Sequence, residues 1–471
     1  MSGSAARHLT RRAFGAPSPG PPTRIAHFGL GSFHRAHQAW FTAHAGDGDE
    51  WGICAFTGRR SAIADSLRPQ EGLYTLIERS AVGDRFEVMT NLVEVYEGSD
   101  SAAIVDVLSR PEVVVVTSTV TESGYRIGLD GSPHFDDAKL ARDIETLREL
   151  TSHDRLDSLT IGTIPGRMLL GLEARRRANV GPIAFVPCDN VPNNGWVLER
   201  GLTQLTDRIS PELGLWLKEN VSFVSTSVDR ITPRTTDRDI AIVAKETRWL
   251  DGAPVVTEPF ASWVISGDFP AGRPQWEQAG ALFVDDIEPY ERRKLWLLNG
   301  AHSILAYLGL EAGHVTVAQA VGDPRCRSAV QSFWSSAAHH LHELELAVYC
   351  GQLVERFENS RIEYQLEQIA SDSLMKLRTR IVPVIVAEFL AGGDCPAGAE
   401  AVAAWIRQVH ARGSFPDDES LTVDSIVGGP HSAVVELIRL VDPHLVGLGA
   451  FVDRVERLVN EGVLIGETTQ T

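Results

Sequence analysis

Cysteine is scarce in this chain, with only five among 471 residues. They stand singly, and no two of them have the CxxC spacing that often marks a structural zinc site. Scattered single cysteines are typical of proteins kept in a reducing compartment, where disulfides rarely persist. We therefore expect a cytoplasmic protein that has neither a disulfide framework nor a zinc cluster. The five are Cys54, Cys188, Cys326, Cys350 and Cys395.

Long apolar runs and an excess of basic residues are also absent. No apolar run reaches the roughly 18 residues that a membrane helix requires, and the N-terminus lacks the apolar stretch of a secretory signal. The 44 Lys and Arg are outnumbered by 62 Asp and Glu, which gives a net charge of −18. Because nucleic acids and cell membranes are also negatively charged, we expect neither as a partner.

The pattern of apolar residues divides the chain near residue 288. At 471 residues the chain is too long for one ordinary core. Short apolar runs alternate with helical spacing up to about residue 285, and helical spacing dominates afterwards. We predict an α/β Rossmann-type dinucleotide-binding domain over residues 24–287 and an all-α substrate-binding domain over 288–471. A flexible segment, rich in Pro, Gly and Ser, is expected over residues 1–23, and a loose tail over 462–471.

The strands and helices follow from the same periodicity. In the first domain the predicted strands are 24–28, 51–57, 72–78, 86–95, 113–116, 158–162, 183–186, 221–226, 255–258 and 281–284. In the second domain the predicted helices are 291–308, 314–321, 323–347, 350–357, 360–370, 375–391, 397–411, 431–442 and 446–461.

A glycine turn follows the first predicted strand and precedes helical spacing. A strand, a Gly-x-Gly turn and a helix form the cradle that holds the phosphates of a dinucleotide. Gly29 and Gly31 provide the two glycines, whereas His34 stands where the third is usually found. This shortened motif is equally compatible with an ordinary tight turn.

The end of the second predicted strand lacks the acidic residue that usually binds the ribose of NAD. Arg59 and Arg60 stand there instead, after Gly58. An arginine at this place can hold the 2′-phosphate of NADP. These arginines can also be solvated loop charges, so the sequence leaves NAD and NADP both open.

The apolar strand 113–116 has the composition of a central parallel strand, buried on both faces. Ligands of open α/β sheets bind at the carboxyl ends of such strands. Thr119, Thr121 and Glu122 follow this end and are candidates for lining the nicotinamide. The alternative is that they simply cap a helix.

A helix is predicted from Glu291 onwards, and its polar residues gather on one side. At about 100° per residue, Glu291, Lys294 and His302 share one face, with Asn299 next to His302. Lone polar residues on apolar helices are often structural. A lysine in an apolar site also has a lowered pKa, however, which suits it to proton transfer near neutral pH.

Four motifs occurring in order resemble the mannitol dehydrogenase family of long-chain polyol dehydrogenases over residues 24–460. They are Gly29-x-Gly31-x-Phe33-His34, Cys188-Asp189-Asn190, Val228-Asp229-Arg230 and Lys294-x4-Asn299-x2-His302. The resemblance implies metal-free hydride transfer between a nicotinamide cofactor and a sugar alcohol or its ketose, at a site between the two domains. It favours NAD as the cofactor.

The resemblance also implies roles for individual residues. Lys294 would be the general acid/base, and Asn190 and Asn299 would hold the reacting oxygen. The remaining assignments are His302 and Asp229 as substrate contacts, Glu291 as a proton relay, and Gly29, Gly31, Phe33 and His34 in the cofactor turn. Lys376 and Arg380 stand where relatives contact the far end of the substrate, and they would favour a carboxylate or phosphate there unless they only form a basic helix face.

We expect a hexitol and its ketose as the substrate pair, bound by a monomer or small homo-oligomer. Close alternatives are a fructuronate reductase and a sugar-phosphate dehydrogenase such as one for mannitol 1-phosphate. A nicotinamide-binding sensor without turnover would belong to another class, and the complete set of Lys294, Asn190 and Asn299 argues against it. Two histidine groups raise the idea of a zinc hydrolase, but neither contains an HExxH motif or a carboxylate at ligand spacing. They are His27, His34 and His37, and His339, His340 and His342.

Overall fold

The computed structural model describes residues 6–58, 61–150, 155–342, 345–371, 373–412, 414–415, 418–422 and 430–468. The contacts between residues divide the chain into two units, Met1–Glu288 and Pro289–Thr471. The first unit combines helices with a parallel sheet, and the described part of the second is helical apart from one short hairpin. This confirms the predicted fold class.

A six-stranded, fully parallel sheet forms the centre of the first unit. Its spatial order is β6-β3-β2-β7-β8-β9. Counted along the chain, the six strands therefore lie in the order 3-2-1-4-5-6, which is the order of dinucleotide-binding sheets. The order reverses between β2 and β7, where such sheets bind their ligands. The strands are β2 (Thr23–Leu30), β3 (Gly52–Thr57), β6 (Leu92–Tyr96), β7 (Val115–Ser118), β8 (Ile183–Pro187) and β9 (Val221–Phe223).

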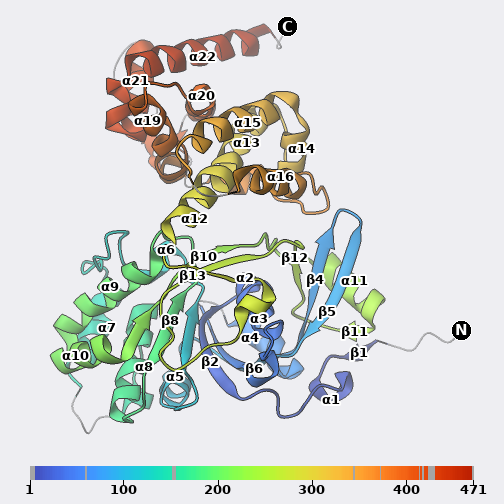
Figure 1. Cartoon of the computed structure of the whole chain (residues 1–471), viewed down its shortest axis with the longest axis vertical. Coiled ribbons are helices and arrows are strands. Elements are labelled where there is room, and N and C mark those ends of the chain that lie inside the picture. Colours follow the sequence, from blue (N-terminus) through green and yellow to red (C-terminus); the bar gives the residue numbers. More distant parts are fainter. Residues whose placement is uncertain are drawn as a thin grey trace, which may run out of the picture. The chain divides into compact units, whose positions relative to one another are not determined.

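Both faces of this sheet are buried, because successive side chains of a strand point to opposite sides. On β2, Ala26 and Phe28 pack into a core with the helices of one face, whereas Ile25 belongs to the core on the other face. Figure 1 shows α5 and α8 side by side along the sheet. The helices of the first face are α5 (Ser101–Leu108), α7 (Ala138–Arg148), α8 (Ile164–Arg177), α9 (Asn194–Ile209) and α10 (Pro211–Asn220).

The first unit also contains short helices and two three-stranded sheets. The core of the second face includes residues of α2 (Ser32–Ala36), α3 (Gln38–Ala43) and α4 (Ala62–Leu67). One small sheet contains β12 (Val255–Thr257), β4 (Tyr74–Ser80) and β5 (Gly83–Met89), and the other contains β10 (Ser225–Asp229), β13 (Ser262–Ser266) and β14 (Leu282–Phe283). The first unit also contains α6 (Glu122–Tyr125) and α11 (Asp237–Thr247).

Three strand predictions in the first unit were wrong. The single strand expected over 86–95 is two strands, β5 and β6, which belong to different sheets. The strand expected over 221–226 is likewise divided into β9 and β10. Residues 158–162 form no strand, because Asp143 accepts hydrogen bonds from the backbone N–H groups of Gly162 (2.9 Å) and Thr163 (2.7 Å) and holds them in an irregular turn.

The N-terminal segment is anchored, although the sequence predicts it to be flexible over 1–23. Residues 7–8 form β1 (Arg7–His8), which pairs with β11 (Trp249–Leu250), and α1 (Arg11–Phe14) follows. The buried Arg11 guanidinium donates to the backbone carbonyls of Thr90 (2.7 Å) and Leu92 (3.0 Å). These bonds fasten the described part of the segment, from residue 6 onwards, to the first unit.

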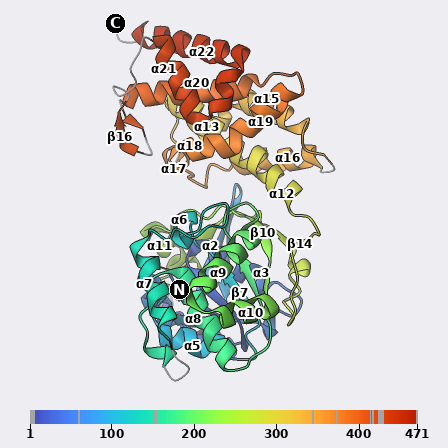
Figure 2. The ribbon, with the colours of Figure 1, turned by 90° about the vertical axis from the view of Figure 1, so that its left-hand side faces the viewer.

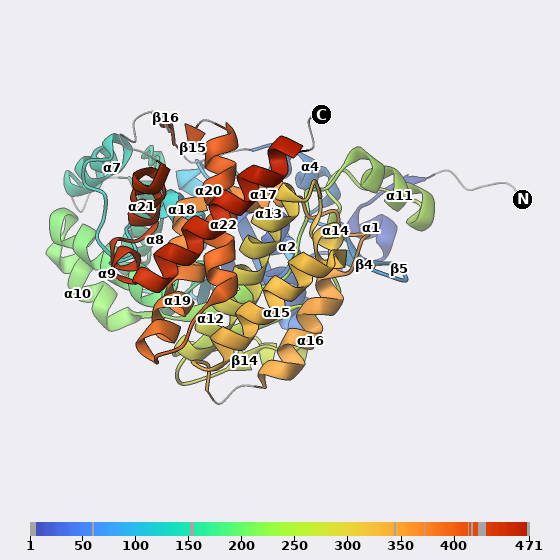
Figure 3. The same ribbon diagram turned by 90° about the horizontal axis from the view of Figure 1, so that it is seen from above.

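The second unit is built around α13 (Gly300–Glu311), most of whose residues are buried. Figure 2 shows α13 among the helices α15, α19 and α20, and Figure 3 shows α22 against α20. The helices are α12 (Glu288–Arg293), α14 (Val317–Gly322), α15 (Pro324–Ala338), α16 (Leu346–Phe357), α17 (Leu366–Ala370), α18 (Ser373–Lys376), α19 (Val382–Leu390), α20 (Pro396–Arg412), α21 (Pro430–Val441) and α22 (Gly449–Thr468).

Several helix predictions in this unit need correction. The helix expected over 291–308 is interrupted by a π-helical turn, η5 (Lys294–Asn299), and a second one, η6 (Leu377–Ile381), interrupts the helix expected over 375–391. The tail expected to be loose is helical up to Thr468. A hairpin of β15 (Ser414–Phe415) and β16 (Asp418–Thr422) was not predicted. Across the described ranges, no helix is both long and apolar enough to span a bilayer.

Candidate active site

The glycine turn lies where the strand order of the large sheet reverses. Gly29 has φ +102, and a Cβ atom there would lie 2.4 Å from the backbone oxygen of Thr119. Only glycine fits such a close approach in the left-handed region. Gly31 is the N-cap residue directly before α2, and a Cβ there would meet only the Gly29 oxygen, at 3.6 Å. The turn is therefore tight on the side of β7 and open at Gly31.

A chain of hydrogen bonds connects the end of β7 to this turn. Thr119 Oγ1 donates to the backbone oxygen of Gly29 (2.8 Å) and so has no second proton for His27 Nε2, which lies 3.1 Å away. His27 Nε2 must therefore carry the proton, and His27 Nδ1 accepts from Thr117 Oγ1 (2.8 Å). Burial lowers the pKa of His27 to about 3, so the ring is neutral. This chain fixes both the histidine tautomer and the direction of the Gly29 carbonyl.

His34 was predicted to contact the cofactor, but the structure places it beneath the turn. Its side chain is 0% exposed and stacks on His27, with ring centroids 3.4 Å apart. Burial, together with the neighbouring His27, lowers its pKa well below the ordinary value. His34 therefore acts as a neutral core residue that supports the turn. Phe33, half-buried, stacks on His37 at 5.0 Å.

The structure describes the side chains of only some of the other predicted cofactor residues. Thr119 is half-buried at the end of β7, and Thr121 is exposed, with its hydroxyl 3.4 Å from Ser123 Oγ. Glu122 begins α6, but its side chain lies outside the described residues, as does Arg59 altogether.

Asn190 is exposed in the turn after β8, and a neighbouring asparagine holds this turn in place. The buried Asn194 side chain donates to the backbone oxygens of Pro187 and Thr226 (3.1 Å each) and accepts from the Thr226 N–H (2.8 Å). It thereby connects the turn after β8 to β10, which ends at the half-buried Asp229. Sequence reasoning missed Asn194, because three nearby asparagines look like an ordinary turn.

In the second unit, Lys294 and Asn299 are the first and last residues of η5. Both are half-buried, and the residues between them include the buried Trp296, Leu297 and Leu298. A π turn is bonded from residue i to i+5, as the Gly300 N–H bonded to the Leu295 oxygen shows. Because this turn is wider than an α turn, two residues five apart lie closer together around the helix axis, so Lys294 and Asn299 face nearly the same side. In the regular helix predicted for this stretch they would lie at opposite edges of the polar side, about 140° apart.

His302 and Arg380 lie beside this turn. His302 is 7% exposed on α13, between the rings of Phe357 (centroids 4.9 Å apart) and Tyr364 (5.3 Å). Arg380 of η6 donates to the backbone oxygen of Asn299 (3.4 Å) and to Ser303 Oγ (3.3 Å). The second unit therefore brings Lys294, Asn299, His302 and Arg380 into one region.

Lys376 and Glu291 are less closely associated with this region. The Lys376 ammonium donates to the backbone oxygens of Ile369 (3.0 Å) and Ser371, at the end of α17. It stabilises that helix end, although it was predicted to bind substrate. Glu291 is half-buried on α12, one turn before Lys294.

Two of the histidines considered for zinc share a carboxylate partner. His339 Nδ1 and His340 Nε2 both lie within 2.9 Å of the same oxygen of the buried Glu388. In the part of the chain that the structure describes, no group of three or more His, Cys, Asp or Glu is arranged to hold a metal ion.

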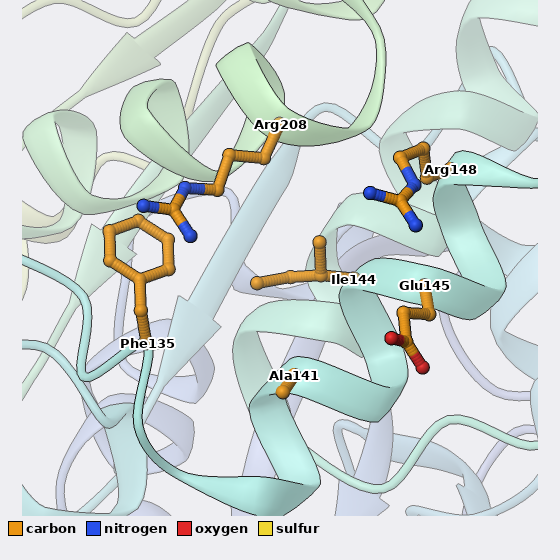
Figure 4. Close-up of a pocket in the computed structure, with 6 residues that line it drawn as sticks. All are labelled: Phe135, Ala141, Ile144, Glu145, Arg148 and Arg208. Atoms are coloured by element: carbon orange, nitrogen blue, oxygen red, sulfur yellow. The ribbon is translucent and has the colours of Figure 1, made fainter.

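A hollow of about 320 Å³ in the first unit lies elsewhere. Figure 4 shows the Arg208 guanidinium beside the Phe135 ring, with Arg148 and Glu145 on α7. The Arg208 guanidinium carbon is 3.5 Å from the centroid of that ring. The predicted site residues do not line this hollow.

Comparisons with known proteins cover both units. The model of the mannitol dehydrogenase Rossmann domain matches residues 23–278, and that of the mannitol dehydrogenase C-terminal domain matches residues 286–418. The chain is 34% identical to the uncharacterized oxidoreductase YeiQ of Escherichia coli (85% of this chain, 81% of that protein). It is 33% identical to D-mannonate oxidoreductase of the same organism (82% and 79%).

A solved structure agrees in fold as well. It is the ternary complex of Pseudomonas fluorescens mannitol 2-dehydrogenase with NAD and D-mannitol, at 30% identity and a TM-score of 0.82, covering 98% of both chains. These matches agree with the two-part fold, and they show that the chain is an oxidoreductase of the mannitol dehydrogenase family.

Proposed function

We propose that the protein is a metal-independent, NAD(P)-dependent polyol dehydrogenase that interconverts a mannitol-like hexitol and its ketose. The observation that carries the proposal is the π turn η5, which places a lysine and an asparagine on one side of an otherwise apolar helix. The mannitol 2-dehydrogenase complex, which resembles this chain over nearly its whole length, supports the substrate class and favours NAD.

The glycine turn fits a dinucleotide. The open space at Gly31 lets a phosphate approach the backbone N–H groups at the start of α2, and Gly29 is held in place by Thr119. We assign Phe33, Thr119, Thr121 and Glu122 to the same cofactor, and Arg59 to the 2′-phosphate when that cofactor is NADP. When bound, the nicotinamide accepts a hydride from the alcohol carbon in oxidation and returns it in reduction.

We assign the transfer of the substrate hydroxyl proton to Lys294. In oxidation its neutral amine takes the proton of the substrate hydroxyl, and in reduction its ammonium form protonates the oxygen of the new alcohol. The half-buried position of Lys294 at the start of η5 supports this role, because a partly shielded side chain can be held in a fixed position for proton transfer to a bound hydroxyl. Glu291, one turn earlier, would exchange that proton with solvent.

The amide groups of Asn190 and Asn299 are assigned to the reacting oxygen. Preorganised donors of this kind stabilise a developing oxyanion by about 2.7–4 kcal/mol each. His302 and Asp229 are assigned to other substrate hydroxyls.

An anionic substrate, such as a hexuronate, is the second candidate. The half-buried Arg380 carries a positive charge next to Asn299 and Ser303, which suits a carboxylate or phosphate at the far end of a substrate. Arg380 is better placed for this than Lys376, whose ammonium already bonds the end of α17. The similarity to D-mannonate oxidoreductase supports the same alternative.

A spectrophotometric panel at 340 nm tests the proposal. It combines mannitol, arabinitol, mannonate, fructose, fructuronate and fructose 6-phosphate with NAD(H) and NADP(H). We expect turnover with mannitol and fructose, and Arg380→Leu should weaken any turnover of the charged compounds far more than that of mannitol and fructose. Cofactor binding without turnover of any compound would instead favour a nicotinamide-binding sensor.

A further inference from the structure

The spacing of Lys294 and Asn299 depends on the kind of helical turn between them. In a regular α-helix, five residues advance by about 500°, which leaves the two side chains about 140° apart. In the π turn η5 they lie on the same side. A change of η5 to α geometry would therefore separate the two side chains without altering either of them.

A π turn needs support from its surroundings, because isolated π helices are rare and the α form normally competes with them. At the junction of η5 and α13 the backbone hydrogen bonding changes from i+5 to i+4. The carbonyl groups there no longer align with the N–H groups as they do in a regular helix. Donors from other elements can satisfy such carbonyls and hold the wide turn in place.

Trp334 of α15 provides such a donor. Its indole Nε1–H donates to the backbone oxygen of Leu297, inside η5, over 2.7 Å, and the bond is buried. The Trp334 side chain is 7% exposed, so water competes little for this bond. Arg380 gives a second, longer bond to the Asn299 oxygen, at 3.4 Å.

Helix α15 also lies close to Gly300, the residue directly after η5. A Cβ atom added to Gly300 would lie 2.7 Å from the ring of Phe333, which precedes Trp334 on α15. The absence of a side chain at Gly300 thus lets α15 approach closely enough for the indole to reach Leu297. Both contacts lie within the second unit and do not depend on the first.

We infer that Trp334 is a positioning residue whose indole N–H keeps η5 in the π form and so holds Lys294 and Asn299 on one side. It acts through the backbone, and it is not among the residues assigned to substrate or cofactor. The consequence for catalysis rests on the proposed function, whereas the hold on the turn does not.

Trp334→Phe tests this inference, because it removes the N–H and keeps an aromatic ring. Trp405→Phe is the matched control, since Trp405 is a buried tryptophan of the same unit whose indole donates to Ser373 Oγ (2.9 Å) and not to η5. Hydrogen–deuterium exchange of the full chain is measured for peptides that cover residues 294–302. We expect exchange there to be about tenfold faster in Trp334→Phe, the size expected for one buried hydrogen bond, and unchanged in Trp405→Phe.

Enzyme kinetics add a readout that a merely structural role would not change. Trp334→Phe should lower kcat about tenfold and shift the pH profile of kcat, while the Kd of NADH stays at the wild-type value. Unchanged exchange over residues 294–302, or an equal change in both variants, would overturn the inference. Failure of the proposed function would look different, because the wild-type chain would then be inactive while residues 294–302 still responded to Trp334→Phe.

Discussion

The hydroxyl of Thr119, directly after β7, donates over 2.8 Å to the carbonyl of Gly29, near the end of β2, and the strand order reverses between these two strands. The end of β7 therefore sets the conformation of the glycine turn after β2. His27 and Thr117 continue the connection into the sheet. The turn is thus held by directed hydrogen bonds as well as by the conformational freedom of glycine.

Thr119→Val should weaken cofactor binding about tenfold, because the Gly29 carbonyl and the His27 N–H both lose a hydrogen-bond partner. Leaving a buried group of this kind without a partner costs about 1–3 kcal/mol. Valine has nearly the shape of threonine, so packing changes little. The Kd of NADH, measured by fluorescence titration, checks this. Thr119→Ser retains the hydroxyl and should bind NADH nearly as the wild type does. Equal Kd values for the valine and serine variants would show that the bond does not control the turn.

Much of the fold could be predicted from the sequence, because buried parallel strands such as 113–116 and 183–186 are continuous apolar runs. The break between β5 and β6 could not. Residues 86–95 keep a strand-like composition throughout, and the division arises where Asn91 donates to the Ala39 oxygen (2.8 Å), a contact between distant parts of the chain. The burial of Arg11 depends likewise on carbonyls about 80 residues away.

Site residues such as Lys294 and Asn299 could be predicted from the sequence, because their side chains have functional groups suited to the reaction. The geometry that places them together could not be, because the same residues suit an α turn and a π turn, and Trp334 of α15 bonds only the folded form. The prediction that His34 contacts the cofactor depended on a similar ambiguity. The motif places it in the turn, but whether its ring faces a ligand or the core depends on its stacking with His27.

Acid should destabilise the protein partly through His27. Burial lowers its pKa from 6.5 to about 3 in the folded state. Between these values the unfolded chain binds a proton that the folded chain does not, so the free energy of unfolding falls as pH decreases, by up to about 1.4 kcal/mol per pH unit. This contribution is constant above pH 6.5. Urea denaturation at several pH values measures the slope.

His27→Gln removes the titrating group and should make the loss of stability below pH 6.5 less steep. His444→Gln, at a side chain that is 88% exposed, is the control and should keep the wild-type pH dependence. A His27→Gln variant with the wild-type slope would mean that His27 does not remain neutral in the folded protein.

Arg59→Ala should weaken NADP binding far more than NAD binding if this arginine holds the 2′-phosphate. Arg59 directly follows Gly58 at the end of β3, although it lies outside the described residues. Loss of a charge-assisted contact to phosphate should cost about tenfold or more in the Kd of NADP. Arg85→Ala, at an exposed arginine of β5, is the control. Equal effects of Arg59→Ala on both cofactors would reject NADP recognition by this residue.

Lys294→Ala should lower turnover by about two to four orders of magnitude, the range of general acid–base catalysis, while the Kd of NADH remains unchanged. The amine is the group assigned to proton transfer, and alanine keeps the helical backbone of η5. Lys376→Ala is a matched control in the same unit, because its ammonium bonds the Ile369 and Ser371 carbonyls and should affect stability more than chemistry. Added methylamine should partly restore the rate of Lys294→Ala and leave that of Lys376→Ala unaffected. A Lys294→Ala enzyme with the wild-type rate would remove the lysine from the mechanism, whatever substrate the panel identifies.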